Sequence, residues 1–382
     1  PRWDGVPAGP KPVMQVPFLS ELHSIRATRA PRAVAARRRG RLTLYLAALT
    51  LAAGGARAAE DPRPTHRFAV VEGQQVVGTL QRVTAAYEDT LPGIGRMFDL
   101  GYEEMTRANP DVDVWLPGDG ADVLLPTQFI LPEAPRDGLV LNVAAMRLYY
   151  FAPEDEDGQR PLFTHPIGIG RVGWATPLGS TRITAKAANP AWYVPESIRK
   201  EHAEAGDPLP AVVPPGPDNP LGAHALRLAM PGYLLHGTNK PAGVGLRVSH
   251  GCIRLYPEDI ASLYEMVPKG TPVHIVEQPY LAGWYGERLM FSAHVPLEET
   301  GGDWLAALEL IDRRVQDAPE GVGSVDIDWR RVARIAREGK GVAYPIETGS
   351  PVPAAWRAAS PLVRTEAVAN YRPPEDEDVP EG

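Results

Sequence analysis

Short runs of hydrophobic residues between polar turns recur through the middle of the chain, and they predict β-strands. They lie within 138–278, where an acidic turn and proline-bearing loops separate them. This pattern of short apolar runs between turn residues is typical of strands. Helical spacing replaces it at Pro195–Ala205 and in "YPEDIASLYEMV" at 256–267. We therefore expect a mainly β domain with few helices over 138–278.

Two other segments flank this domain. Residues 65–131 begin with β-branched positions, continue through two short helical patterns and end on a strand-like run, which predicts a small β-α-α-β unit. A joint that contains proline and glycine, 132–138, follows it. Residues 279–370 contain two helical patterns, the second with Asp328 as its expected N-cap. The acidic tail 371–382 has the composition of a disordered segment.

A basic cluster, a short apolar run and small residues follow one another in 37–58. This is the pattern of a secretory signal peptide that is cleaved after Ala58. The apolar run, Leu42–Gly55, is shorter than the roughly 20 residues that a membrane-spanning helix needs, so a membrane anchor is the weaker alternative. We therefore expect an exported protein. Residues 1–36 show no clear periodicity and stay unassigned.

The charge balance narrows the range of partners. The chain has 382 residues, with 39 Lys or Arg against 47 Asp or Glu, and a net charge of −8. The predicted signal segment is rich in arginine, so its removal leaves a still more acidic protein. Nucleic-acid binding needs a basic surface that displaces counterions, and this composition disfavours it.

A single cysteine, Cys252, is the most informative residue of the chain. A single cysteine excludes an intramolecular disulfide, although the oxidising environment of an exported protein would permit one. A buried structural cysteine would need apolar neighbours, because it behaves as a small hydrophobe. Cys252 lies instead in "VSHGCIRL", among Ser, His, Gly and Arg. We interpret it as a reactive thiol.

Two histidines precede this thiol, His236 at the end of an apolar strand pattern and His250 two positions before it. A thiol becomes a good nucleophile when a base takes its proton or a positive charge lowers its pKa. A strand end that presents His236 opposite a loop that presents Cys252 would place base beside nucleophile. Gly251 permits close approach of the backbone, and amides around Cys252 are candidates for an oxyanion hole.

Other sites built from the same residues are weaker alternatives. A zinc site could use His236, His250 and Cys252, with His224 as a fourth ligand, but structural zinc usually has more than one thiolate. Papain-like peptidases carry their cysteine far ahead of the histidine, whereas here the order is reversed. A purely structural histidine remains open for His224.

The residues around this thiol resemble a known family. "HGT" at 236–238 followed by "SHGCIRL" at 249–255 closely resembles the signature of the L,D-transpeptidases, whose catalytic domain is of the YkuD type. The longer run between them, with "TPLGSTRITAKAANPAWYVP" and "LNVAAMRLYYF", is similar to a Gram-negative subgroup that carries a LysM module and includes lipoprotein-anchoring enzymes. Arg254 departs from the widest family pattern, where asparagine is frequent, and agrees with the subgroup.

The 65–131 segment also resembles the LysM module, a small fold that binds N-acetylglucosamine-containing glycans. The likeness lies in the order of Asp89-Thr90-Leu91, Asn109-Pro110 and "LPG" at 116–118. On the residues alone the segment is only a small α+β domain, because no single side chain in it dictates sugar binding. For 138–278, the family resemblance implies a β-sandwich-like catalytic domain.

The Gram-negative resemblance also implies a periplasmic enzyme and a reaction that needs neither cofactor nor metal. Cys252 would attack the carbonyl of the third residue of a peptidoglycan tetrapeptide stem and release the terminal D-alanine. An amine would then resolve the thioester. His236 would be the base, with its second ring nitrogen bonded to the carbonyl of Gly237. His250 would support the site or help to protonate the leaving amine.

Substrate contacts and the acceptor are less determined by the sequence. Ser249 and Arg254 are candidates for holding substrate carboxylates, Arg247 is a weaker candidate, and Gly237 is also assigned to the substrate-binding set. For each arginine a surface ion pair is the alternative. The acceptor amine could belong to a diaminopimelate side chain or to a lysine of an outer-membrane lipoprotein. Two other functions stay open: a peptidoglycan-binding protein, and a hydrolase in which water resolves the thioester. The role of 279–370 is not predicted.

Overall fold

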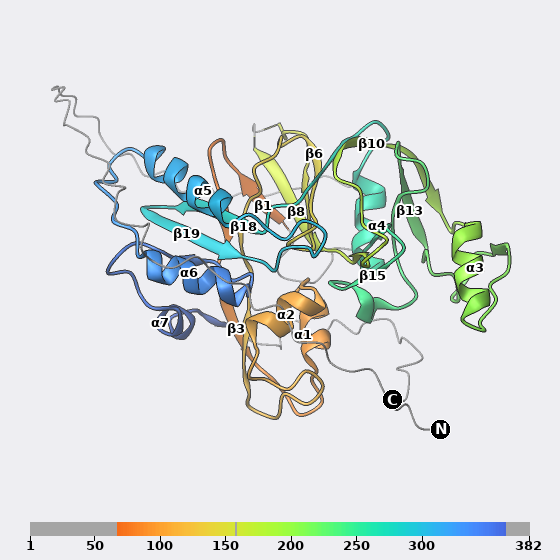
Figure 1. The fold of residues 1–382 in the computed structure, drawn as a ribbon, viewed down its shortest axis with the longest axis horizontal. Helices are drawn as coiled ribbons and strands as arrows, with labels where there is room; N and C mark the ends of the chain where they lie inside the picture. The colour runs from red at the N-terminus through yellow and green to blue at the C-terminus, as the bar shows by residue number, and fades with distance from the viewer. Residues whose placement is uncertain (1–66, 157–158, 364–382) are drawn as a thin grey trace, which may run out of the picture. The chain divides into compact units, whose positions relative to one another are not determined.

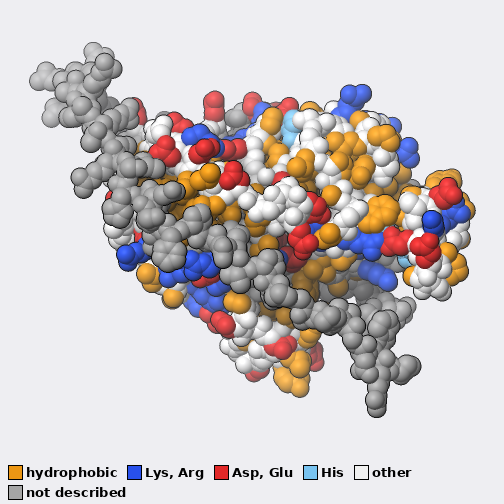
Figure 2. Space-filling model, in the orientation of Figure 1, with side chains coloured by type: hydrophobic (Ala, Val, Ile, Leu, Met, Phe, Trp, Pro, Cys, Tyr) orange, Lys and Arg blue, Asp and Glu red, His pale blue; other side chains and the backbone are white. Residues whose placement is uncertain are grey.

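A computed structural model describes residues 67–156 and 159–363 (Figure 1). All of these residues belong to one compact unit. The predictions for 1–36, 37–58 and 371–382 lie outside the described residues. In the described part of the chain, no helix is both long and apolar enough to cross a membrane. Acidic and basic side chains are interspersed over the face that Figure 2 shows.

One large mixed sheet dominates the described residues, with nine strands in the order β1-β8-β7-β6-β17-β10-β13-β14-β16. Neighbouring strands are antiparallel except in the pairs β17–β6 and β14–β16, which are parallel. The mainly β prediction holds in part, since helices accompany this sheet and the fold is mixed α/β. The strands of the sheet are β1 (Arg67–Val70), β6 (Gly138–Asn142), β7 (Arg147–Phe151), β8 (Arg160–Pro166), β10 (Gly179–Ala188), β13 (His224–Leu228), β14 (Leu234–His236), β16 (Ile253–Arg254) and β17 (Pro272–Val276).

Both faces of the sheet are buried. Leu139 and Tyr150 point into one core, which α4 (Pro257–Met266) helps to close. Val140 and Tyr149, the neighbouring positions, point into a second core that they share with apolar residues of the N-terminal segment. Burying a large apolar side chain stabilises the fold by about 1.5–3 kcal/mol, so an uncovered second face would be costly. The N-terminal segment is therefore part of the packing of the large sheet.

The N-terminal segment contains the predicted β-α-α-β order, as β3 (Gln81–Thr84), α1 (Leu91–Met97), α2 (Tyr102–Ala108) and β4 (Asp122–Leu125). β3 and β4 pair as antiparallel strands, as the two ends of such a unit must. Thr90 begins α1 as its N-cap, because its side chain accepts a hydrogen bond from the amide of Gly93. β1, which precedes this unit, pairs with β8 at the edge of the large sheet.

The C-terminal segment forms a three-stranded sheet covered by two helices. The strands are β18 (Tyr280–Tyr285), β19 (Arg288–Ala293) and β20 (Tyr344–Pro345). Both predicted helices are confirmed, as α5 (Trp304–Gln316), which packs against β18, and α6 (Trp329–Glu338), which packs against β19 (Figure 1). Asp328 is the N-cap of α6, as predicted, and accepts from the amide of Arg331. The remaining elements are β2 (Val76–Gly78), β5 (Gln128–Ile130), β9 (Ile169–Gly170), β11 (Trp192–Tyr193), β12 (Val212–Val213), β15 (Arg247–Ser249), β21 (Leu362–Val363), α3 (Glu196–Glu204), α7 (Pro353–Ala358) and a 3-10 turn at Pro241–Gly243.

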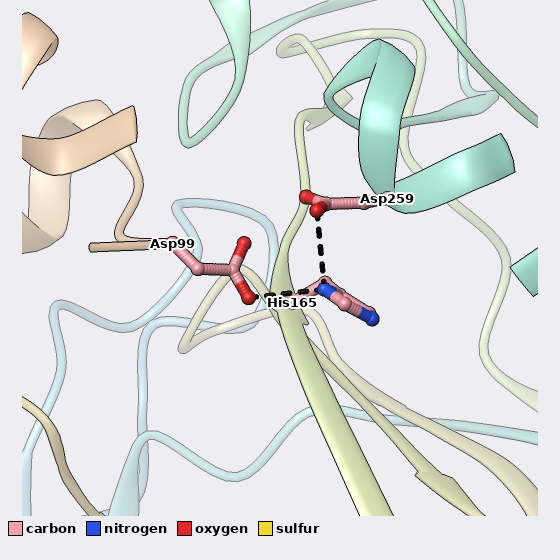
Figure 3. A group of neighbouring side chains, drawn as sticks. All are labelled: Asp99, His165 and Asp259. Atoms are coloured by element: carbon pink, nitrogen blue, oxygen red, sulfur yellow. Dashed lines mark hydrogen bonds and ion pairs between the residues drawn. The ribbon is translucent and has the colours of Figure 1, made fainter. Parts of the chain in front are cut away.

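A buried ionic cluster joins three parts of the fold (Figure 3). Nδ1 of His165, on β8, lies 3.0 Å from a carboxylate oxygen of Asp99 and 3.3 Å from one of Asp259. Burial alone would lower the pKa of His165, but the two carboxylates outweigh it and raise this pKa to about 10. The imidazole is therefore charged at neutral pH. It connects the turn after α1 to the large sheet and to α4.

Candidate active site

The pairing of two short strands decides where base and nucleophile lie. β14 ends at His236, and it pairs in parallel with β16 so that Leu235 faces Ile253 and His236 faces Arg254. Cys252 directly precedes β16, which places it opposite the first residue of β14. Residues two apart on a strand share a face, so His236 and Cys252 project from the same side of this pair. The predicted strand-end base and loop nucleophile thus come together.

His236 and Cys252 line a cleft with a volume of about 640 Å³. Its walls are largely aromatic and apolar, which suits a site from which water is excluded during the reaction. Polar side chains are also part of its lining. The lining residues that matter below are His236, Ser249, His250, Cys252 and Arg254, with Trp174, Trp192, Tyr193 and Tyr233 among the aromatic ones.

His236 is buried, and a backbone carbonyl fixes the orientation of its ring. Nδ1 lies 2.6 Å from the carbonyl oxygen of Gly237, as the resemblance implied. A carbonyl can only accept, so Nδ1 carries the proton and Nε2 keeps its lone pair. Burial, with a smaller contribution from the positive charge of Arg254, lowers the pKa of His236 to about 4, although the hydrogen bond to Gly237 acts in the opposite direction. The imidazole is therefore neutral near pH 7, as a general base must be.

Cys252 is half-buried, and its thiol lies 3.5 Å from the carbonyl oxygen of Gly232. Burial raises the pKa of this thiol, although the backbone of Leu234 and the charge of Arg254 act in the opposite direction. The resting site therefore holds a protonated thiol beside a neutral imidazole. Such a pair reacts when the base takes the proton as the sulfur attacks.

The loop that carries the thiol is held by its own hydrogen bonds. The hydroxyl of Ser249 donates to the carbonyl of Cys252 over 2.6 Å and accepts from the amide of Gly251 over 3.1 Å. Thr176 donates to the carbonyl of Gly251. Gly251 has a φ of 99°, and a Cβ there would lie 2.9 Å from the ring of Tyr233. Ser249 thus shapes the loop, and the amide of Gly251 is engaged within it.

His250 contacts a different part of the cleft wall. Its Nε2 lies 3.1 Å from Nη2 of Arg171 and 3.3 Å from a carboxylate oxygen of Glu201, which is on α3. The ring of Trp174 packs edge-on against it, with centroids 4.9 Å apart. Burial lowers the pKa of His250, as does Arg171, while Glu201 acts in the opposite direction. His250 therefore supports the wall of the cleft. Arg171, Trp174, Thr176 and Glu201 were not among the residues predicted from the sequence.

The predicted substrate residues occupy different positions. Arg254 lines the cleft, and among the described residues no carboxylate forms an ion pair with it. Arg247 does not line the cleft, because its guanidinium forms an ion pair with Glu299 at 2.6 Å. Gly237 contributes its carbonyl to His236 and is not part of the cleft lining. Arg254 is thus the predicted cation that remains available to a ligand.

Comparison with known proteins shows the family to which this chain belongs. Residues 136–275 match the family model described as the L,D-transpeptidase catalytic domain. The chain is also 41% identical over 245 residues to the probable L,D-transpeptidase YbiS of Escherichia coli (strain K12), covering 63% of this chain and 76% of YbiS. The chain belongs to the L,D-transpeptidase family. Membership makes it an L,D-transpeptidase and implies a peptidoglycan substrate.

Other relatives of this L,D-transpeptidase share the same description. The probable L,D-transpeptidase YcfS of Escherichia coli (strain K12) is 44% identical over 216 residues, which are 55% of this chain and 66% of YcfS. Among solved structures, the catalytic domain of the Enterococcus faecium L,D-transpeptidase is 21% identical with a TM-score of 0.28, covering 38% of this chain and all of that domain.

Replacing His236 with Ala should slow acylation of Cys252 by a carbapenem about 10²–10⁴-fold, because the thiol loses its base. His250→Ala should slow it less, since His250 contacts the cleft wall through Arg171 and Glu201. Mass spectrometry of the adduct over time gives these rates. A larger loss in the His250 variant would assign the base to His250.

In the unsubstituted protein, acylation should persist in weak acid and decline as the pH approaches about 4, where His236 becomes protonated. The same mass-spectrometric rates, measured over a range of pH, test this.

Proposed function

We propose that this protein is exported to the periplasm and transfers the acyl group of a peptidoglycan tetrapeptide stem through a thioester on Cys252. The observation that carries the proposal is the placement of a neutral, buried imidazole and a thiol on one side of the β14–β16 pair, in the lining of the same cleft. The family to which the chain belongs supports the choice of substrate.

The reaction follows from the protonation states of the resting site. Nε2 of His236 takes the thiol proton as sulfur attacks the carbonyl carbon of the third stem residue. The tetrahedral intermediate collapses, the imidazolium gives its proton to the leaving nitrogen, and D-alanine departs with that proton. A neutral acceptor amine then attacks the thioester while His236 accepts its proton, and the thiol is regenerated on release of the new amide.

Arg254 is the residue that we propose for a carboxylate of the donor stem. Its guanidinium lines the cleft, and its Nε is buried without a hydrogen-bond partner. A buried donor without a partner is costly, so a carboxylate that enters here gains a charge-assisted bond. Ser249 is a weaker candidate for this role, because its hydroxyl already bonds within the loop.

The acceptor that we propose is a primary amine, either on a diaminopimelate side chain or on a lysine of an outer-membrane lipoprotein. The first gives a cross-link between two third residues, and the second attaches the lipoprotein to the wall. The two acceptors differ in product mass. A hydrolase would leave tripeptide stems instead.

Incubation of the protein with purified sacculi, with and without a peptide that ends in lysine, should release D-alanine and give a new conjugate by mass spectrometry of muropeptides. Cys252→Ala should give no product, because no other thiol exists in the chain. The variant should keep its fold, since the change removes only one sulfur. D-alanine release by Cys252→Ala would refute the thioester, and tripeptide as the sole product would identify a hydrolase.

We also propose that 65–131 is a LysM-type module that binds the glycan strand. Tyr87, which precedes α1, is 81% exposed, while Trp115 and Leu116, which follow α2, are 56% and 75% exposed. Exposed aromatic rings next to apolar side chains are typical of surfaces that bind other molecules, since a ring combines a large apolar face with a polar edge. The β-α-α-β order of the segment supports the same assignment.

Trp115→Ala should weaken sedimentation of the protein with sacculi and leave acylation of Cys252 by a carbapenem unchanged. The ring would contact glycan, and a carbapenem contains none. Leu305→Ala is the matched control, because Leu305 is a 64% exposed apolar residue on α5, outside the module. Equal sedimentation of both variants and the unsubstituted protein would contradict a glycan site at Trp115.

A further inference from the structure

The loop that joins base to nucleophile is held from outside by the N-terminal segment. The amide of Tyr102 donates to the carbonyl of Val244 over 3.1 Å, and that of Glu103 donates to Gly245 over 3.2 Å. These are the first amides of α2, which have no partner within the helix. Their acceptors lie in 237–246, the stretch between His236 and β15. The beginning of α2 therefore satisfies its amides with the backbone of the catalytic loop.

Two glycines allow this contact between backbones. A Cβ on Gly245 would lie 2.4 Å from the nitrogen of Tyr102, and one on Gly101 would lie 2.8 Å from Cα of Gly245. Gly245 also has a φ of 80°, which disfavours other residues. Real Cβ atoms do not approach other atoms this closely. The contact thus leaves no room for the loop to shift towards α2.

The same turn also contacts the chain that follows the thiol. The hydroxyl of Tyr256 donates to the carbonyl of Leu100 over 3.1 Å. Arg96 forms a bidentate ion pair with Glu258, in which Nε and Nη2 donate to the two carboxylate oxygens over 3.0 and 3.2 Å. The cluster of Figure 3 adds a third link, from the turn after α1 through β8 to α4. The α1–α2 turn, 96–104, therefore contacts the chain on both sides of the catalytic motif.

A buried arginine makes this turn rigid. Arg147, on β7, donates to both carboxylate oxygens of Glu104 at 2.7 Å and to the carbonyl of Asp99 at 2.8 Å. The carboxylate of Glu104 in turn accepts from the amide of Gly101. Ionic groups that are buried and fully bonded resist displacement, because any movement leaves a charge without its partner.

We propose that the α1–α2 turn is a positioning element of the active site. It fixes the loop 237–246 at Val244 and Gly245, and the start of α4 at Tyr256, and so holds His236 and Cys252 in register. None of its residues lines the cleft, so it acts through the catalytic loop and the start of α4. The inference rests on the proposed roles of His236 and Cys252. It gives the N-terminal segment a part in the chemical step in addition to any binding of glycan.

A pair of substitutions at Tyr102 tests the hydrogen bond to Val244. Proline is favoured at the first position of a helix, and Gly101, with φ −81° and ψ 165°, has the conformation that a residue before proline adopts. Tyr102→Pro therefore keeps α2 but replaces the donated N–H with a ring carbon. Tyr102→Ala is the control, because it removes the same side chain and keeps the N–H.

The readout is acylation of Cys252 by a carbapenem, resolved into the limiting rate and the concentration that gives half of it. Tyr102→Pro should lower the limiting rate about 10–100-fold relative to Tyr102→Ala, with the half-saturating concentration unchanged, because a small misplacement of reacting groups has effects of this size. Equal limiting rates in the two variants would overturn the proposal. Failure of the unsubstituted protein to react would refute the proposed function instead.

A second pair separates positioning from loss of stability, should Tyr102→Pro fail to fold. Gly101→Ala adds a methyl group 2.8 Å from the catalytic loop. Gly283→Ala adds one 2.9 Å from Gln75, at a junction that does not contact the motif. Both should lower the melting temperature, and only Gly101→Ala should lower the limiting rate of acylation, measured well below the melting temperature. Equal rates in these two variants would show that the turn is structural only.

Discussion

The parallel pairing of β14 with β16 is the constraint on which the site depends. β16 is two residues long and forms the edge of the large sheet, so its backbone hydrogen bonds to β14 alone would hold it weakly. A bridge to Gly168, with bonds of 2.8 and 2.9 Å to Arg254, holds it from the other side. The cores on the two faces of the sheet and the α1–α2 turn then keep this edge in place. Much of the chain thus serves to hold one histidine beside one cysteine.

Burial sets the chemistry of that pair. It lowers the pKa of His236 and raises that of the Cys252 thiol, so both groups are uncharged at rest. The charge of Arg254 lowers both values, which disfavours an imidazolium but favours a thiolate. Proton transfer therefore accompanies attack on the substrate, and the resting thiol is less reactive than a thiolate would be.

The sequence predicted the parts of this molecule that have a local signal. Helices such as α6 follow from spacing and an N-cap, and a lone cysteine among polar residues identifies the motif. The β18–β19 hairpin was missed, although two short runs of apolar and aromatic residues on either side of Gly286 are a hairpin signal. The pairing of Arg247 with Glu299 and the cluster around His165 could not be predicted, because their partners are distant in sequence and carry no periodic pattern.

Alkylation of the thiol as a function of pH tests the central claim, that the resting pair is uncharged, most directly. Cys252 is the only cysteine, so uptake of iodoacetamide by the folded protein reports this one group. Because burial raises its pKa, alkylation should be slow at neutral pH and should accelerate only at or above the pH at which an ordinary thiol ionises. A fast rate that is already constant at neutral pH would show a preformed thiolate–imidazolium pair and contradict the account.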